Sequence, residues 1–166
     1  LKLVVVQHKN VQNELVQYSF NQPQIAQASH VLVICIPATY SLAEVDAYFE
    51  LIQKIRNTPH EILNPFQDFL KGEIAEKSQQ ELKVWNTNQA YLALGNLLTV
   101  CALEKIDACP MEGFLPEKYD ELLHLEAQNL TSVLVLPVGF RAADDYMKDL
   151  PKVRKGTANC VIKFSE

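Results

Sequence analysis

A proline-to-glycine turn, Pro110-Met111-Glu112-Gly113, is the part of the sequence best suited to holding a ligand through its backbone. Proline fixes the chain where the turn begins, and glycine lets backbone N–H groups come close to a bound molecule. A carboxylate, Glu112, lies between them. Taken alone, such a segment is usually an ordinary turn, so its role depends on what the fold places around it.

A second candidate is the basic segment 152–155, in which Lys152, Arg154 and Lys155 follow an expected strand and loop. Cations grouped in this way could hold a phosphate through charge-assisted hydrogen bonds. The competing interpretation is a solvated basic loop, which is the commoner outcome for such a segment by itself.

Several familiar sites cannot be built from this sequence. The five glycines are at positions 72, 95, 113, 139 and 156, which leaves neither a G-x-G-x-x-G loop nor a P-loop. The histidines form no H-E-x-x-H motif or i,i+4 pair, which argues against a metal site. No serine lies in a G-x-S-x-G elbow, and the neighbours Ser29 and His30 are expected to point apart. Nucleophilic hydrolysis is therefore disfavoured.

Composition predicts one globular domain over residues 1–166. The hydrophobic share is 48%, and 15 Lys and Arg against 20 Asp and Glu give a net charge of −5, which argues against a nucleic-acid surface. The longest apolar run, 31–36, is far too short to cross a bilayer. The start of the chain lacks a signal-peptide pattern, and four widely spaced cysteines suggest reduced thiols. We therefore expect a soluble, cytoplasmic protein.

Hydrophobic periodicity predicts an α+β fold with a mixed central sheet flanked by helices. The first expected strand is a short β-branched run and reads as a strand buried on both faces, and the run at 31–36, ended by Pro37, is the strongest strand signal in the sequence. The expected strands are 3–6, 31–36, 132–138 and 160–164, and a short extended stretch is expected at 107–110. The expected helices are 10–20, 23–28, 45–55, 84–103 and 116–126, and Ser41 followed by Glu44 predicts a capping box ahead of the third.

Two of the helical segments have unusual patterns. Residues 60–83 are interpreted as a mobile, solvated helical excursion, with a loop between Pro59 and Pro65, a break at Gly72, and Phe66 and Phe69 among its few apolar anchors. Residues 84–103 are apolar on almost every face, so this helix should be buried in a core or across a subunit interface.

Four segments in this order and spacing resemble the nitroreductase family of FMN-dependent NAD(P)H oxidoreductases: NQAYLALGNLL (88–98), IDACPMEGF (106–114), LPVGFR (136–141) and LPKVR (150–154). Each motif is weak alone, but together they are specific, and the resemblance covers essentially the whole chain. It implies an α+β homodimer with the long apolar helix at its centre. It also implies FMN in a cleft at the subunit interface, and a C-terminal strand available to the neighbouring sheet.

The resemblance also assigns the cofactor site. The turn lines the flavin near N5, with the Gly113 amide as a donor; Lys152 and Arg154 match the phosphate ligands. Asn21 matches a contact to the ring edge, and Gln24 stands where related enzymes often carry lysine. Phe66 and Phe69 are candidates for covering the ring and contacting substrate, or are simply helix anchors. The implied cofactor-binding residues are Asn21, Gln24, Pro110, Met111, Glu112, Gly113, Lys152 and Arg154.

The chemistry implied needs no catalytic side chain. Hydride would pass from NAD(P)H to flavin N5 and then to a nitroaromatic, quinone or pteridine acceptor in the same slot, giving ping-pong kinetics. The family's N-terminal helical segment has no counterpart in these 166 residues, so we expect the domain to be N-terminally incomplete. The alternative is a non-catalytic dimeric α+β remnant of the family that does not hold flavin.

Overall fold

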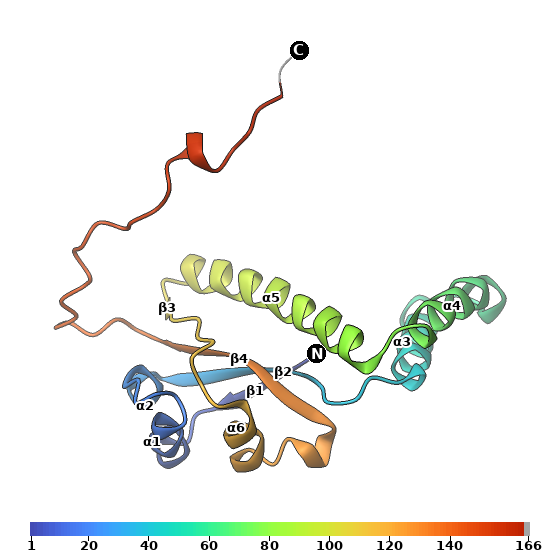
Figure 1. Cartoon of the computed structure of the whole chain (residues 1–166), viewed down its shortest axis with the longest axis horizontal. Helices are drawn as coiled ribbons and strands as arrows, with labels where there is room; N and C mark the ends of the chain where they lie inside the picture. The colour runs from blue at the N-terminus through green and yellow to red at the C-terminus, as the bar shows by residue number, and fades with distance from the viewer. Residues whose placement is uncertain (165–166) are drawn as a thin grey trace.

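Strands and helices alternate along the chain and assemble around one sheet, as shown in Figure 1. The structure, a computed structural model, describes residues 1–164. The strands are β1 (Lys2–Val6), β2 (His30–Pro37), β3 (Asp107–Ala108) and β4 (Leu130–Gly139). The helices are α1 (Lys9–Gln17), α2 (Gln24–Gln27), α3 (Leu42–Arg56), α4 (His60–Ala75), α5 (Gln79–Leu103) and α6 (Pro116–Leu122), with 3₁₀ turns η1 (Glu126–Gln128) and η2 (Thr157–Asn159).

The four strands lie in the order β1-β2-β4-β3, and every pair among the described residues is antiparallel. The expected α+β class is confirmed, but the expectation of mixed strand directions is wrong for these pairs. The reason is visible in the first connection: Val6, at the end of β1, pairs with Val31, near the start of β2. Helices α1 and α2 thus return the chain to the end of the sheet that it left, so β2 must run back along β1.

Strands β2 and β4 form the centre of the sheet and are covered on both faces. In β2, Val31, Val33 and Cys35 join one buried cluster, whereas Ile34 and Ile36 join another. A register shift between Ile34 and Cys35 marks a bulge in this strand. The predicted strand is confirmed, and burial from two sides explains why its apolar run is continuous.

Strand β1 lies at the edge of the sheet and is covered on one face only. Val4 and Val6 pack into the cluster formed with α1 and α2. Leu3 and Val5 point the other way and are 45% and 52% exposed. The expectation of a strand buried on both faces is thus wrong for β1 within this chain, because α5 packs on β2, β3 and β4 but does not extend over the edge.

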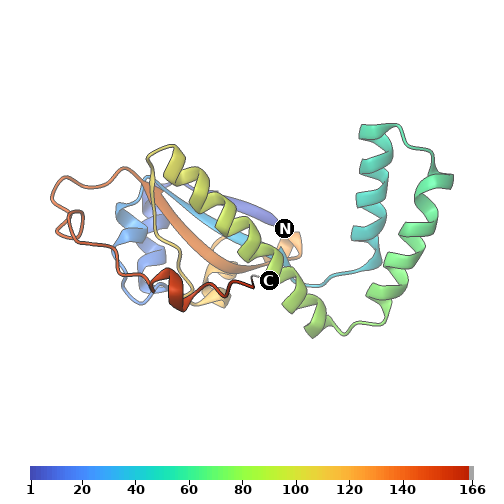
Figure 2. The ribbon, with the colours of Figure 1, turned by 90° about the horizontal axis from the view of Figure 1, so that it is seen from above.

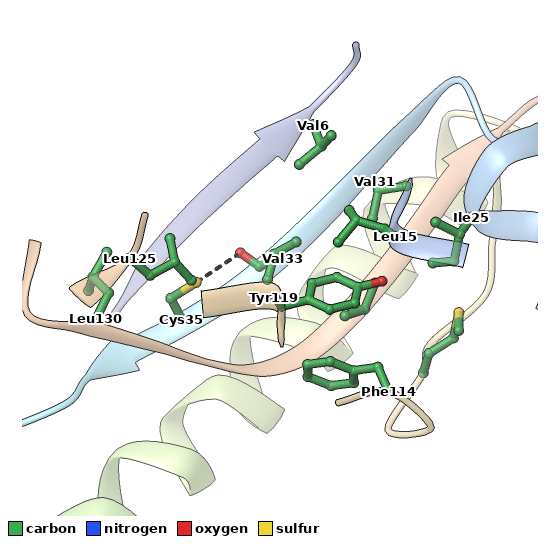
Figure 3. Close-up of a cluster of buried hydrophobic side chains, with 12 residues drawn as sticks. Val6, Leu15, Ile25, Val31, Val33, Cys35, Phe114, Tyr119, Leu125 and Leu130 are labelled. Carbon is green, nitrogen blue, oxygen red and sulfur yellow. Dashed lines mark hydrogen bonds between the residues drawn. The ribbon is translucent and has the colours of Figure 1, made fainter. Parts of the chain in front are cut away.

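The larger core lies between the sheet and helices α1, α2 and α6 (Figure 3). The rings of Phe114 and Tyr119 meet edge to face, with centroids 4.8 Å apart. The hydroxyl of Ser19 donates to the carbonyl of Leu15, so the buried Tyr119 hydroxyl donates to Ser19 Oγ over 2.6 Å. This bond joins the end of α1 to α6 inside the core.

Helix α5 covers the opposite face of the sheet with one side only (Figures 1 and 2). It begins at Gln79 rather than at the predicted residue 84, because Ser78 and Glu81 form a capping box. Ala90 and Leu94 pack on the sheet. Large apolar side chains on its other side are exposed: Val84, Trp85, Leu92, Val100 and Leu103. Nowhere in residues 1–164 is a helix long and apolar enough to span a membrane.

Helices α3 and α4 form a hairpin that projects away from the sheet (Figures 1 and 2). The predicted capping box of Ser41 and Glu44 is present and starts α3. The loop expected between Pro59 and Pro65 is wrong: α4 starts at His60, directly after Pro59, and contains Pro65 near its start. Proline at this position lacks the N–H that would bond the carbonyl four residues back, so the second turn of α4 tolerates one missing hydrogen bond. Gly72 lies within α4, so the expected break falls instead between α4 and α5.

Beyond β4 the chain leaves the sheet and extends as an irregular segment, residues 140–164, with η2 as its regular part (Figure 1). The strand predicted at 160–164 is not formed, since within residues 1–164 this run pairs with no other strand. Its apolar side chains Val161, Ile162 and Phe164 are exposed. The run is β-like in sequence, but a strand requires a neighbour.

Candidate functional site

The proline-to-glycine turn is held against the centre of the sheet by its first residues. The N–H of Cys109 donates to the carbonyl of Pro137 over 3.0 Å. Met111 and Val135 exchange backbone hydrogen bonds of 2.8 and 3.0 Å, and the Met111 side chain is buried in the larger core. The segment 109–114, hereafter the 109–114 turn, is therefore fixed in register on β4.

The loop between α1 and α2 holds the other end of the turn. The side-chain amide of Gln22 donates to the carbonyl of Gly113 over 3.0 Å. The amide of Gln24 donates in turn to Gln22 Oε1 over 2.9 Å. Phe20 and Asn21 both have left-handed backbone conformations, with φ of 51° and 58°, which bend the loop toward the turn. Gln22 was not predicted as a site residue; its only signal was its place between Asn21 and Gln24.

Gly113 is required by space rather than by backbone conformation. A Cβ at this position would lie 3.1 Å from Gln22 Nε2 and 3.4 Å from a ring carbon of Phe20. No glycine has a positive φ. The N–H groups of Glu112 and Gly113 donate no hydrogen bond to any part of residues 1–164. Two adjacent donors are thus presented by a turn whose backbone is otherwise held in place.

The side chain of Glu112 is the exposed element of the turn and is bound from α5. The hydroxyl of Tyr91 donates a short hydrogen bond to Glu112 Oε1. This bond raises the pKa of Tyr91 above its ordinary value, because it favours the protonated hydroxyl. Tyr91 was not predicted as a site residue, although it lies within the NQAYLALGNLL motif.

A cavity of about 690 Å³ opens between α2, the end of β4 and the first residues after β4. Gln24 and Cys109 line it beside the turn, and Ser29, Gly139 and Arg141 line it farther along. A Cβ on Gly139 would lie 3.0 Å from the backbone nitrogen of Ser29, so glycine permits this close approach. The cavity extends the surface of the turn toward the segment 140–164.

Ser29 and His30 do not point apart as expected. Ser29 Oγ lies 2.8 Å from His30 Nδ1, and His30 Nε2 lies 3.3 Å from Gln7 Oε1. The geometry arises because β2 begins at His30, while Ser29 still belongs to the bend that follows α2. Ser29 lies in no G-x-S-x-G elbow. Its contact with His30 therefore serves to fix the chain where β2 begins.

The two predicted phosphate ligands lie on the segment 140–164, which runs away from the sheet (Figure 1). Both side chains are exposed, and Arg154 Nη1 donates to the neighbouring carbonyl of Val153 over 2.7 Å. The chain does not bring Lys152 or Arg154 to the 109–114 turn in this arrangement.

The two predicted ring-covering phenylalanines lie on α4, in the projecting hairpin. The rings of Phe66 and Phe69 are stacked with centroids 6.3 Å apart, and Phe66 also meets Phe49 edge to face. Figures 1 and 2 both show the hairpin well apart from α2 and β3, which flank the turn. Phe49 is buried within the hairpin, whereas Phe66 and Phe69 are exposed.

The structure thus divides the predicted site into two groups. The loop 20–24 and the 109–114 turn meet at one end of the sheet and bring together Asn21, Gln24, Pro110, Met111, Glu112 and Gly113. The second group, outside that meeting point, consists of Lys152, Arg154, Phe66 and Phe69.

A family model described as "Nitroreductase family" matches residues 1–140. The chain is 33% identical over 140 residues to the major NAD(P)H-flavin oxidoreductase of Aliivibrio fischeri, a match that covers 83% of this chain and 64% of that protein. It is 31% identical over 144 residues to the oxygen-insensitive NAD(P)H nitroreductase of Salmonella typhimurium, covering 82% and 64%. The chain therefore spans just under two thirds of the length of these relatives.

Solved structures show the same fold. The nitroreductase family protein of Streptococcus pneumoniae matches with a TM-score of 0.78 at 24% identity, covering 98% of this chain and 78% of that one. A protein from Exiguobacterium sibiricum, solved in complex with FMN, matches with a TM-score of 0.82 at 17% identity, covering 98% and 76%. At these identities the likeness concerns the fold.

Proposed function

The chain belongs to the nitroreductase family, and from this membership we propose that the protein is an FMN-dependent NAD(P)H oxidoreductase. The observation that supports the proposal best is the pair of unpartnered N–H groups of Glu112 and Gly113 on a turn held from both sides. Backbone donors fixed in this way suit the acceptor atoms along one edge of a flavin ring, because they need no rearrangement on binding.

The residues around the turn fit the ring and would fix its position. Gln24 offers a side-chain amide at the junction of the turn and the cavity, and Asn21 stands in the same loop. Gln24 is neutral, so it would hold the ring edge by hydrogen bonding rather than by opposing charge. The absence of a Cβ on Gly113 lets Gln22 and Phe20 pack closely on the turn, which helps to fix its backbone.

Bound FMN would supply the chemistry, accepting hydride from NAD(P)H and passing it to a nitroaromatic, quinone or pteridine acceptor in a ping-pong sequence. The chain would contribute position and electrostatics. The 109–114 turn supplies donors and the cavity supplies room, and neither task needs an acid or base among these side chains.

We further propose that Lys152 and Arg154 bind the flavin phosphate. Two cations separated by one residue suit an anionic group, and Arg154 keeps most of its guanidinium donors exposed. The segment that carries them would have to fold toward a flavin site for this contact. Its exposed, irregular path is compatible with such a rearrangement.

We also propose a homodimer. Three apolar surfaces are left open in the single chain: the outer side of α5, the outer face of β1 and the run at 160–164. Exposed apolar area on this scale is typical of a protein interface. In a dimer, the projecting hairpin could reach the flavin of the partner subunit, and there Phe66 and Phe69 would cover the ring.

A cytoplasmic location is part of the same proposal. Cys35, Cys101, Cys109 and Cys160 are all free thiols. Unpaired cysteines, two of them exposed, suit a reducing compartment. Fractionation of cells that express the protein would test this assignment.

The competing function is a dimeric family member that does not hold flavin. The distance of the segment carrying Lys152 and Arg154 from the turn favours this reading (Figure 1). A flavin titration followed by anaerobic mixing with NADH or NADPH separates the two functions. The proposed enzyme binds about one FMN per chain and its bound flavin is bleached by the nicotinamide, whereas protein that takes up no FMN would overturn the enzyme assignment.

A further inference from the structure

The 109–114 turn has three attachments, and one of them has no evident structural need. Met111 holds the turn on β4, and Gln22 holds Gly113 from the loop after α1. These two contacts fix the backbone. The third joins the exposed side chain of Glu112 to Tyr91 on α5, and within residues 1–164 it is the only hydrogen bond of that carboxylate.

The carboxylate of Glu112 can compete with a ligand for the backbone N–H groups of its own turn. A glutamate side chain next to unpartnered backbone N–H groups can fold back and accept their hydrogen bonds, as acidic side chains do at helix starts and turns. Such a contact would occupy the N–H groups of Glu112 and Gly113. The bond to Tyr91 turns the carboxylate toward α5 and so away from that position.

We propose that Tyr91 is a positioning residue that restrains the Glu112 carboxylate and keeps the N–H groups of Glu112 and Gly113 free to bind flavin. The proposal rests on the FMN-binding function proposed above. It gives the hydroxyl of Tyr91, a residue that is 44% exposed on α5, a function. It also makes α5 part of the cofactor site through a single side chain.

The hydrogen bond between Tyr91 and Glu112 would also control the negative charge near the flavin ring. A hydroxyl donated to a carboxylate draws off part of its negative charge, and it fixes where that charge lies. Released from Tyr91, the carboxylate would be free to approach the flavin, and a negative charge there disfavours the electron-rich reduced form. The raised pKa of Tyr91 means that its hydroxyl stays protonated, and able to donate, at neutral pH.

The test is Tyr91→Phe, compared with Tyr18→Phe as the matched control. The Tyr18 hydroxyl makes no hydrogen bond within residues 1–164, and its backbone contact with Leu115 is kept in the variant. Amide exchange by NMR is measured first on flavin-free protein, where Tyr91→Phe should slow exchange of the Glu112 and Gly113 N–H groups roughly three- to tenfold, in line with one modest hydrogen bond. Tyr18→Phe should leave these rates at the wild-type value.

FMN binding provides the second readout. Tyr91→Phe should weaken oxidised FMN roughly three- to tenfold. It should weaken reduced FMN up to about tenfold more, which for a two-electron couple lowers the midpoint potential by about 30 mV. In a Glu112→Ala background, Tyr91→Phe should have no further effect on either quantity, because no carboxylate remains to be positioned.

The outcomes distinguish this proposal from the function on which it rests. If wild-type protein binds no FMN while Tyr91→Phe still slows amide exchange, the flavin assignment fails and the restraint of Glu112 stands. If FMN binds but Tyr91→Phe matches Tyr18→Phe in exchange and potential, the role of Tyr91 is wrong. Equal losses with and without the Glu112 carboxylate would likewise overturn it, since Tyr91 would then act through packing.

Discussion

The sheet with α1, α2, α5 and α6, here called the body, differs from the two projections, the α3–α4 hairpin and the segment 140–164, in what completes it. The body buries apolar residues on both faces of β2 and β4. The projections leave large apolar groups in solvent, with Phe66 at 58% and Phe69 at 59% exposure. The central strands of the body are buried by contacts within the chain, whereas the projections, like the outer sides of α5 and β1, leave apolar surfaces that suit a further partner.

The candidate site divides along the same boundary. The turn and the loop that holds Gly113 belong to the body, and hydrogen bonds join them to each other and to β4. The proposed phosphate ligands and ring-covering aromatics belong to the projections. The part of the site proposed to recognise the ring is therefore preformed, and the parts proposed to close over it depend on how the projections pack.

The largest expected effect is a loss of folding stability, and it should occur at one of two leucines of α5 but not at the other. Leu94 faces the sheet and is 7% exposed, whereas Leu92 faces outward and is 69% exposed. Leu94→Glu places an unpaired charge in the core of the body and should cost about 3–5 kcal/mol, a large share of the stability of a typical domain. Leu92→Glu should keep the fold and abolish the proposed dimer.

Circular dichroism with urea titration measures the first effect, and sedimentation velocity measures the second. A folded Leu94→Glu protein would contradict the packing of α5 on the sheet. If wild type and Leu92→Glu sediment alike as monomers, the dimer proposal fails while the description of the body is unaffected.

The second effect concerns thiol reactivity. Burial raises the pKa of Cys35, in β2, to about 12, with the charge of Asp120 adding to the effect. Because the thiolate is the reactive form, a pKa raised from 9 to 12 lowers its population about a thousandfold near pH 8. Cys109 and Cys160 are exposed. A disulfide reagent followed by peptide mass spectrometry should label these two at once and Cys35 only upon unfolding.

The third effect tests the proposed phosphate contact. Arg154→Ala removes a charge-assisted hydrogen bond, a loss of about 1.5–3 kcal/mol, and should weaken FMN roughly ten- to a hundredfold without changing the unfolding transition of the body. Lys155→Ala is the control, because it removes a neighbouring cation that the family motif does not include. Equal losses in the two variants would indicate general attraction by a basic loop, and no loss would remove Arg154 from the site.

Elements that local burial or capping defines were predictable from the sequence, whereas elements that depend on pairing with another segment were not. The run at 31–36 and the capping box at Ser41 gave β2 and α3, because burial and capping are local properties. The run at 160–164 is equally strand-like but forms no strand, since pairing depends on a second segment. For the same reason β1 looked buried from two sides although it lies at an edge.

Residues of the candidate site could be proposed from the sequence where a motif marked them, but not where only long-range contacts bring them in. Gly113 and Glu112 stood out through the proline-to-glycine turn. Gln22 and Tyr91 did not, because their roles arise from hydrogen bonds to residues 91 and 21 positions away in the chain. A single sequence shows which residue types are present but carries no direct record of such long-range pairs.

The smallest expected effect is the loss of a helix cap, which can be compared between the hairpin and the body. Ser41 caps α3 in the hairpin and Ser78 caps α5 in the body, each as a full capping box with a glutamate. Ser78→Ala should lower the free energy of unfolding by about 1 kcal/mol, because α5 unfolds with the sheet. Ser41→Ala should increase amide exchange within α3 and leave global unfolding nearly unchanged, because the hairpin opens separately. Equal global losses would show that hairpin and body unfold as one unit.

Lowering the pH should abolish the stabilisation that the Ser78–Glu81 capping box gives to α5 before the protein unfolds. Hydrogen bonds from the Ser78 hydroxyl and backbone N–H lower the pKa of Glu81 below its ordinary value. For a carboxyl with a lowered folded-state pKa, the stabilisation is present above the unfolded-state value and disappears as pH falls through the folded-state one. Amide exchange over the first turn of α5 should therefore rise as pH is lowered through that range, after correction for intrinsic rates. In Ser78→Ala this dependence should largely vanish, and a wild-type profile unchanged by the substitution would show that Glu81 titrates independently of the cap.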